Sequence, residues 1–255
     1  MNNGDIIRMR SYPSPSDVVE LYEITYWSEN TRVKGLLGVP REPTDEGLLY
    51  LRGGMQRIGM VRPARVVQYA QQGFVVFAPY YRGNRGAGGR DEFVGIDRFD
   101  AVHGVTVLRK FMTANVYVIG FSRGGAMALW TAILRDDISA VVSWAGMTNI
   151  ALTYQERLDM RRMMKRVIGG TPTKVPNAYA VRTPLQRVKD IRARILIIHG
   201  KRDAHVSFAH AEQLAIATGG RADTWYYSEF AHAFPPKENR DVVRALSLWM
   251  KEGSV

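Results

Sequence analysis

Ser122 stands in a sequence pattern that could make its hydroxyl a nucleophile. It lies within Gly120-Phe121-Ser122-Arg123-Gly124, after the apolar run Val116–Ile119 and before a stretch rich in Ala, Met and Leu. This order predicts a strand, a sharp turn and a helix, an arrangement that lifts the serine clear of a sheet. So tight a turn requires small residues two positions on either side of the serine. We expect Ser122 to attack a carbonyl carbon; the alternative is a glycine-rich turn without chemistry.

A serine hydroxyl is a weak nucleophile near neutral pH and needs a base, usually a histidine oriented by a carboxylate. On a sheet of this kind the acid and then the histidine follow the serine, each in a loop after a late strand. His232 follows the last apolar strand and fits the base, with His205 as the serious rival among five histidines. The other three are expected on other elements: His103 on a helix before the serine, His199 at the end of a buried strand and His210 within a helix.

The best candidate for the acid is Asp203, in the turn Gly200–Val206 after the penultimate strand. Asp190 and Asp223 precede strands instead of following them, so both belong at the opposite edge of the sheet. The structural alternative for Asp203 is an N-cap or turn aspartate of the helix that begins near Val206.

A tetrahedral oxyanion needs two preorganised hydrogen-bond donors. The backbone N–H of Arg123, directly after the nucleophile, is the first candidate. The second should come from the loop after the strand 48–51, where Gly53-Gly54 lets the backbone approach a substrate closely. We expect the N–H of Gly54 in this role, with Met55 as the second choice; the glycine pair could also form a simple turn.

A β-sheet is needed to position these residues, and the hydrophobic pattern of the sequence predicts one. Residues 6–10, 18–26 and 32–39 read as antiparallel strands with a bend at Gly35. After residue 47, strands alternate with helices, which predicts a mostly parallel sheet with helices on both faces. The expected strands are 48–51, 74–79, 116–121, 138–144, 195–198 and 224–227, and the expected helices are 62–72, 97–112, the one after Ser122, 208–218 and 240–251.

Residues 147–194 interrupt this alternation with a helical pattern and several prolines. We interpret them as a small helical insertion over the carboxyl ends of the strands, where parallel sheets bind ligands, and thus as a candidate lid. The rest of the chain shows no linker, repeat or low-complexity segment, so residues 1–255 are expected to form a single domain.

Composition excludes several classes of site. The chain has no cysteine, so disulfides, a thiolate nucleophile and Cys-ligated zinc are ruled out. The first residues lack an apolar signal core and no apolar run is long enough to span a membrane, so we expect a cytoplasmic protein without a membrane partner. The formal charge of +11 comes from dispersed Lys and Arg, densest at Arg161–Arg166. We interpret it as solvated surface and expect no nucleic-acid partner, although a mild preference for acidic partners stays open.

With these residues placed, the chain resembles the α/β-hydrolase superfamily, and within it the catalytic domain of the prolyl oligopeptidase family and its small stand-alone esterase relatives. The resemblance runs from about Gly47 to the C-terminus. It rests on Gly120–Gly125, on His199–Asp203 and on the segment around His232. The later stretches Gly169–Pro172, Asn177–Tyr179 and Thr183-Pro184 are similar to a family series of GGTP, AY and SP.

The resemblance implies a serine hydrolase of α/β-hydrolase fold that needs no cofactor or metal. Arg52-Gly53-Gly54-Met55 stands where relatives often carry His-Gly-Gly-Pro, and His232-Ala233-Phe234 replaces their His-Gly-Phe. Family peptidases usually carry a β-propeller, which the residues before Gly47 are too few to build. We therefore expect a hydrolase of small carboxylic esters that works through an acyl-enzyme. A peptidase acting on short or acylated peptides is the alternative, and a non-catalytic binding protein is a more distant one; acyl specificity and oligomeric state stay open.

Overall fold

A computed structural model describes residues 1–252, whose strands form one nine-stranded sheet in the order β1-β2-β3-β5-β4-β6-β7-β8-β9. The first three strands, β1 (Ile6–Tyr12), β2 (Val19–Ser28) and β3 (Thr31–Pro40), are antiparallel to their neighbours. Glu29 and Asn30 join β2 to β3 with positive φ angles of 42° and 58°. A two-residue turn of this hand suits the twist of the two strands. The predicted antiparallel start is confirmed.

The predicted bend at Gly35 is wrong. Gly35 lies inside β3, where it pairs in continuous register with Ile24 of β2. A Cβ atom on Gly35 would lie 2.6 Å from the ring of Phe77, which packs across the strand at this point. The glycine therefore makes room for an aromatic ring of the core, which a reading of one strand alone does not reveal.

The remaining strands make the parallel part of the sheet. They are β4 (Gly47–Leu51), β5 (Val75–Pro79), β6 (Val116–Phe121), β7 (Ala140–Trp144), β8 (Arg194–Gly200) and β9 (Ala222–Tyr227). Strands β4 to β9 run parallel, and only the pair of β3 with β5 joins the two parts in antiparallel fashion. All residues of β5 and β7 are buried, as expected for strands covered on both faces.

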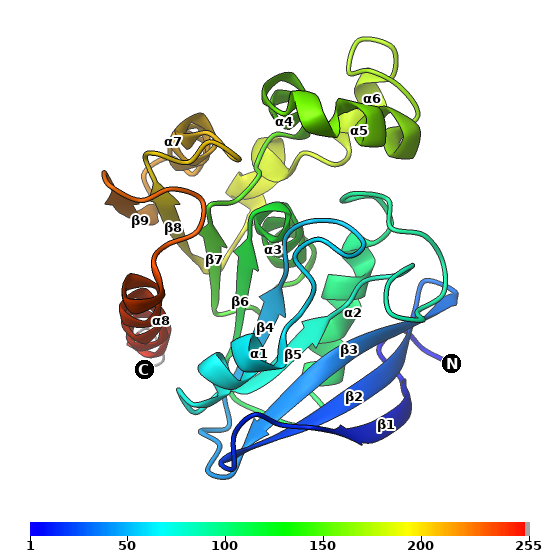
Figure 1. Cartoon of the computed structure of the whole chain (residues 1–255), viewed down its shortest axis with the longest axis vertical. Coiled ribbons are helices and arrows are strands. Elements are labelled where there is room, and N and C mark those ends of the chain that lie inside the picture. Colours follow the sequence, from blue (N-terminus) through cyan, green and yellow to red (C-terminus); the bar gives the residue numbers. More distant parts are fainter. Residues whose placement is uncertain (253–255) are drawn as a thin grey trace.

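Helices cover both faces of the sheet (Figure 1). One apolar cluster packs α1 (Pro63–Ala70) and α8 (Pro236–Lys251) on one face. The other packs α2 (Arg98–Leu108), α3 (Arg123–Leu134) and α7 (Phe208–Ala217) on the opposite face. Helix α8 begins four residues before the predicted Arg240, because Pro236 occupies the first helical position, which proline suits.

Between β7 and β8 the chain is helical, as expected for residues 147–194. It forms α4 (Ile150–Glu156), the 3-10 helix η1 (Leu158–Met160), α5 (Arg161–Ile168), α6 (Pro176–Ala180) and the 3-10 helix η2 (Pro184–Asp190). In Figure 1, α4, α5 and α6 lie together beyond the ends of β6 and β7. This segment therefore stands over the edge of the sheet where the candidate residues gather.

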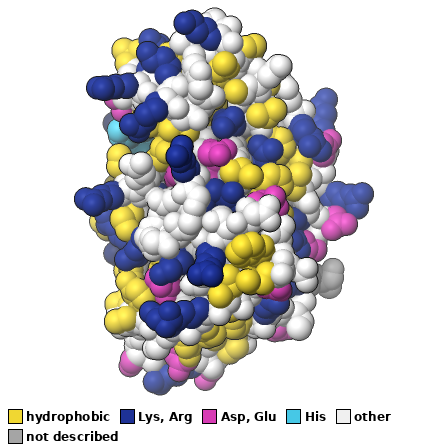
Figure 2. Space-filling model, turned by 90° about the vertical axis from the view of Figure 1, so that its right-hand side faces the viewer, with side chains coloured by type: hydrophobic (Ala, Val, Ile, Leu, Met, Phe, Trp, Pro, Cys, Tyr) yellow, Lys and Arg dark blue, Asp and Glu magenta, His cyan; other side chains and the backbone are white. Residues whose placement is uncertain are grey.

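Two surface properties bear on possible partners. Lys and Arg are spread over the face in Figure 2, with apolar and acidic side chains between them. No helix in residues 1–252 combines the length and the apolar character that a membrane-spanning segment needs.

Candidate active site

Ser122 lies on a strained turn between β6 and α3. Its φ of 57° and ψ of −121° are unusual for a residue with a side chain, and surrounding packing must hold them. A Cβ on Gly120 would come within 1.9 Å of the Gly124 carbonyl oxygen, and one on Gly124 within 2.0 Å of the Leu51 oxygen. Both glycines are therefore required by close backbone approach, as the sequence pattern indicates.

The backbone of Ser122 is also tied to the end of β7. Its N–H donates to the carbonyl of Trp144 at 3.0 Å, and its own carbonyl accepts from the N–H of Met147 at 3.0 Å. The turn is thereby joined to the first residues of the 147–194 segment.

Asp203 and His232 meet in a direct hydrogen bond. His232 Nδ1 lies 2.7 Å from Asp203 Oδ2, and the carboxylate is buried. Burial alone would raise the pKa of Asp203, but hydrogen bonds from His199, His232 and the Val206 N–H outweigh it and lower that pKa below its usual value. The carboxylate is therefore ionised across the neutral range, and Nδ1 of His232 carries the proton that it accepts.

The second carboxylate oxygen of Asp203 has a structural task. Oδ1 accepts the backbone N–H groups of His205 at 2.8 Å and Val206 at 2.9 Å. The N-cap of α7 is Ser207, so Asp203 does not cap that helix. Oδ1 of Asp203 therefore stabilises the turn after β8, whereas Oδ2 of the same carboxylate binds His232.

The rival histidines occupy other environments. His205 is exposed, and its ring centre lies 5.2 Å from that of His232. His199 is buried and donates from Nε2 to the Val206 carbonyl at 2.9 Å. His210 is buried in α7, where its Nδ1 accepts the Thr148 N–H at 3.1 Å and burial lowers its pKa to about 4. Of these three, only His205 faces the same cavity as Ser122.

One expected oxyanion donor directly follows the nucleophile in the chain, and the other belongs to the loop after β4 that contacts the serine. Helix α3 begins at Arg123, whose N–H has no acceptor within the helix. A Cβ on Gly53 would lie 2.8 Å from the Cβ of Ser122, so the loop after β4 touches the serine. Gly54 follows with a φ of +64°, and both Gly54 and Met55 line the cavity at this point.

Arg52 holds that loop from behind. Its guanidinium is 1% exposed and donates to three backbone carbonyls, those of Gly53 at 3.0 Å, Ile58 at 3.1 Å and Tyr80 at 3.2 Å. The group also lies over the Tyr81 ring, 5.2 Å from its centre. Arg52, which stands where relatives often carry histidine, therefore stabilises this loop through buried hydrogen bonds. Its spacing in the sequence did not indicate this role.

The side chain of Arg123 is wholly buried next to the nucleophile turn. It forms an ion pair with Asp91 at 2.5 Å and approaches Asp97 at 3.8 Å. Its guanidinium also lies 5.0 Å from the centre of the Tyr81 ring. Burial raises the pKa of Asp97 to about 6, although the charge of Arg123 opposes the rise. The loop before α2 is thus fastened to the residue that follows the nucleophile.

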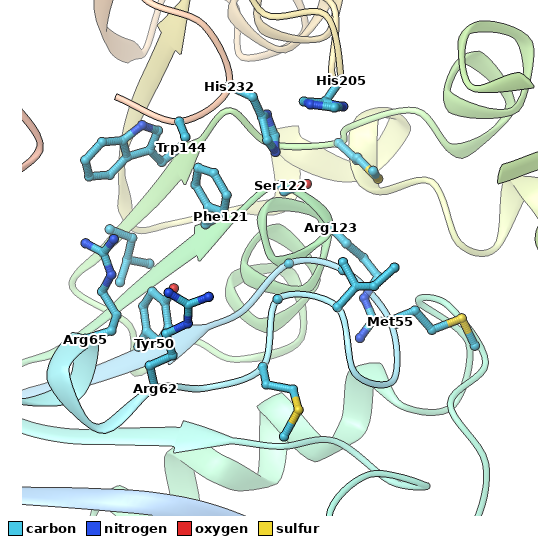
Figure 3. Close-up of a pocket in the computed structure, with 18 of the residues that line it drawn as sticks. Tyr50, Met55, Arg62, Arg65, Phe121, Ser122, Arg123, Trp144, His205 and His232 are labelled. Carbon is cyan, nitrogen blue, oxygen red and sulfur yellow. The ribbon is translucent and has the colours of Figure 1, made fainter. Parts of the chain in front are cut away.

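A cavity of about 1100 Å³ opens over Ser122. Figure 3 shows the imidazole of His232 directed toward Ser122, with His205 beside it and Phe121 below. The His232 and Phe121 rings lie 4.8 Å apart. Met160 and Met163 of the 147–194 segment line one side of the cavity, and α1 and α8 contribute to another. Within residues 1–252 no cluster of three or more His, Asp or Glu side chains is arranged to hold a metal ion.

Comparisons with known proteins agree with this architecture. A family model described as the prolyl oligopeptidase family matches residues 61–253. A protein of Bacillus subtilis named uncharacterized peptidase YtmA is 50% identical over 254 residues, which cover 96% of this chain and 99% of the relative.

Among solved structures, acetyl xylan esterase from Paenibacillus superposes with a TM-score of 0.76 at 15% identity, over 94% of this chain and 88% of the other. An esterase of Pyrococcus furiosus gives 0.74 at 17% identity, over 97% of each chain. Acylaminoacyl peptidase of Pyrococcus horikoshii gives 0.78 at 16% identity, and there 94% of this chain corresponds to 42% of the longer one. The predicted α/β-hydrolase fold is confirmed, and the chain belongs to the prolyl oligopeptidase family of serine hydrolases.

Proposed function

We propose that the protein hydrolyses small carboxylic esters through an acyl-enzyme formed on Ser122. The observation that carries this proposal is the Asp203–His232 hydrogen bond of 2.7 Å beside a serine held on a strained turn in the same cavity. A buried, ionised aspartate on Nδ1 fixes the imidazole tautomer that leaves Nε2 free to accept the serine proton.

The steps follow from these positions. Ser122 Oγ attacks the ester carbonyl while His232 takes its proton, and the backbone N–H groups of Arg123 and Gly54 stabilise the oxyanion. His232 then protonates the departing alcohol. Water, activated by the same histidine, attacks the acyl carbon and frees Ser122.

The sharpest test is covalent labelling. A fluorophosphonate probe should attach to Ser122 in the wild-type protein, and mass spectrometry of the digested protein locates the adduct. Ser122→Ala should lose both the label and the hydrolysis of p-nitrophenyl acetate. A folded wild-type protein that takes no label would overturn the proposal.

A peptidase is the second candidate, because the Bacillus subtilis relative is named a peptidase and the cavity is large enough for a short acylated peptide. Amide cleavage requires His232 to protonate a poor leaving amine. We expect kcat/KM to be higher for p-nitrophenyl esters than for aminoacyl p-nitroanilides of the same acyl group. The reverse order would favour the peptidase.

We further propose that residues 147–194 act as a lid on a chain that folds as one domain. Met160 and Met163 line the cavity, so this segment shapes the space for the acyl group. Met163→Ala should shift the preferred acyl length upward, and thermal unfolding should show a single transition. The cytoplasmic location expected from the sequence is tested by cell fractionation.

A further inference from the structure

We propose that the part of the cavity between α1 and α8 is a carboxylate subsite, and that the preferred substrates are esters with a second, ionised carboxyl group at the far end of an apolar chain. Arg62 and Arg65 of this part, together with Arg240, define what we term the arginine lobe. This inference rests on the proposed ester hydrolysis and adds the class of substrate to it.

The cavity carries an excess of positive charge. Its lining includes one aspartate and six arginines, namely Arg62, Arg65, Arg123, Arg157, Arg166 and Arg240, against Asp159. Arg123 is neutralised by Asp91 and Arg157 by Asp159, at 2.5 and 2.7 Å. Within residues 1–252, none of the three arginines of the arginine lobe forms a salt bridge. A ligand anion would therefore meet charges that the protein itself leaves uncompensated.

Two hydrogen bonds to neutral groups hold the Arg65 side chain in place, so its positive charge is not neutralised by an ion pair within the described part of the chain. Its Nη1 donates to Gln68 Oε1 at 2.7 Å and to Asn239 Oδ1 at 2.8 Å. Both acceptors are neutral amide oxygens, one from α1 and one from α8. A guanidinium has five N–H donors, so this anchoring leaves others available to a ligand. A half-buried arginine held in this way is preorganised, unlike a lysine or arginine that moves freely in solvent.

The space in front of these arginines is walled by aromatic rings. Figure 3 shows Arg62 and Arg65 directed toward the region bounded by Tyr50, Phe121 and Trp144. The Phe121 and Trp144 rings pack edge to face, with centres 6.4 Å apart. These walls suit an apolar chain, whereas the guanidinium groups at its end suit a carboxylate, which arginine can bind through two parallel hydrogen bonds.

The distance to the nucleophile also fits such a substrate. Tyr50 pairs with Ile119 in the neighbouring strand, and Ile119 lies three residues before Ser122. At about 3.3 Å per strand residue, the end of the aromatic wall formed by Tyr50 lies roughly 10 Å along the strand from the serine, whereas Phe121 is next to it. A diacid of medium length, esterified at one end, spans this interval with its free carboxylate at the arginines.

The test compares substrates that differ only in the charge. The mono-p-nitrophenyl esters of adipate and suberate are paired with the neutral hexanoate and octanoate esters, and the readout is the ratio of kcat/KM within each pair. One hydrogen bond to a charged group corresponds to roughly a tenfold or greater preference. We expect the wild type to prefer the anionic ester by at least this factor, and added salt to reduce the preference.

Arg65→Gln should bring the ratio close to one, because glutamine keeps a polar side chain with N–H donors and removes the charge. Arg192→Gln is the matched control: Arg192 is an exposed arginine outside the cavity, and its loss should leave the ratio unchanged. A wild-type ratio of one or less, or a ratio that Arg65→Gln does not change, would overturn the subsite.

A binding experiment keeps this result separate from the fate of the proposed function. Ser122→Ala protein should be stabilised thermally by monomethyl adipate and not by methyl hexanoate. Stabilisation of the Ser122→Ala protein by the anion, together with no ester turnover by the wild-type protein, would support the subsite and refute the esterase. Turnover of neutral esters by the wild-type protein without anion binding would support the esterase and refute the subsite.

Discussion

Replacement of Arg52 by methionine should lower both catalysis and stability, through two effects that can be measured separately. The substitution removes the guanidinium that donates to the carbonyls of Gly53, Ile58 and Tyr80 and leaves these acceptors without that partner. Methionine keeps an unbranched side chain that can fill the space. The loop from Gly53 to Ile58 then loses the contact that fixes it against Ser122.

The expected magnitudes follow from the contacts. Hydrogen bonds to a charged group are each worth about 1.5–3 kcal/mol, and the three distances of 3.0–3.2 Å point to the lower end of that range. Burial, and then the nearby charge of Arg123, lower the pKa of Arg52, so keeping this cation inside the protein opposes part of the gain. We expect Arg52→Met to reduce the free energy of unfolding by about 2–4 kcal/mol. A displaced oxyanion donor should reduce kcat by about 10²–10³.

Steady-state kinetics on p-nitrophenyl acetate and urea unfolding measure the two effects separately. The fall should appear in kcat with a smaller change in KM, because the loop acts on the transition state more than on ground-state binding. Arg52→Lys should recover part of kcat. Arg194→Met, which removes an arginine of β8 that donates to the Trp249 carbonyl of α8, is the control and should keep kcat. If folded Arg52→Met keeps kcat within about threefold of the wild type, less than the loss of one oxyanion donor, the loop does not depend on this brace.

Three further outcomes are expected. His232→Ala should reduce kcat by about 10⁴ or more and His205→Ala by less than tenfold, measured on the same ester, because of these two imidazoles it is that of His232 that is hydrogen-bonded to Asp203; equal losses would contradict this assignment. Asp97→Asn should gain stability relative to the wild type as pH rises from about 4 to 7 in urea titrations. The folded protein binds the Asp97 proton more tightly than the unfolded chain, with a pKa raised to about 6, so the wild type loses stability over this interval and the variant does not; parallel pH curves would show that Asp97 is not buried as an acid. Gly124→Ala should fail to give soluble, probe-reactive protein, since its Cβ would meet the Leu51 carbonyl, whereas Gly170→Ala, at a glycine without a positive φ whose Cβ would meet only side chains at 3.3 Å or more, should remain folded and reactive.

The fold could be predicted from the sequence because the spacing of apolar residues and glycines depends on local structure. Apolar runs of strand length became the buried strands, and Gly120 and Gly124 stand where backbone atoms nearly touch. The order of Ser122, Asp203 and His232 along the chain allowed their meeting at one sheet edge to be anticipated, because carboxyl ends of parallel strands share that edge. Their catalytic roles remain a prediction until the labelling experiment is done.

The parts that could not be predicted depend on contacts between distant segments. Gly35 looked like a bend because its partner, the ring of Phe77, comes from another strand. The burial of Arg123 depends on Asp91, in the loop between β5 and α2, and on Asp97, at the start of α2, and neither lies near Arg123 in the sequence. Arg52 donates its hydrogen bonds to backbone carbonyls and forms no ion pair among the described residues, so no acidic residue in the sequence could have indicated its role.

The hydrogen bond from the Met147 N–H to the Ser122 carbonyl limits how this enzyme can be re-engineered. The helical segment over the cavity is the natural target for exchange between relatives when a different acyl preference is wanted. Its first residue, however, also supports the backbone of the nucleophile. A transplanted segment should therefore begin after Met147, so that its new side chains reshape the cavity while the turn that carries the serine keeps its own geometry.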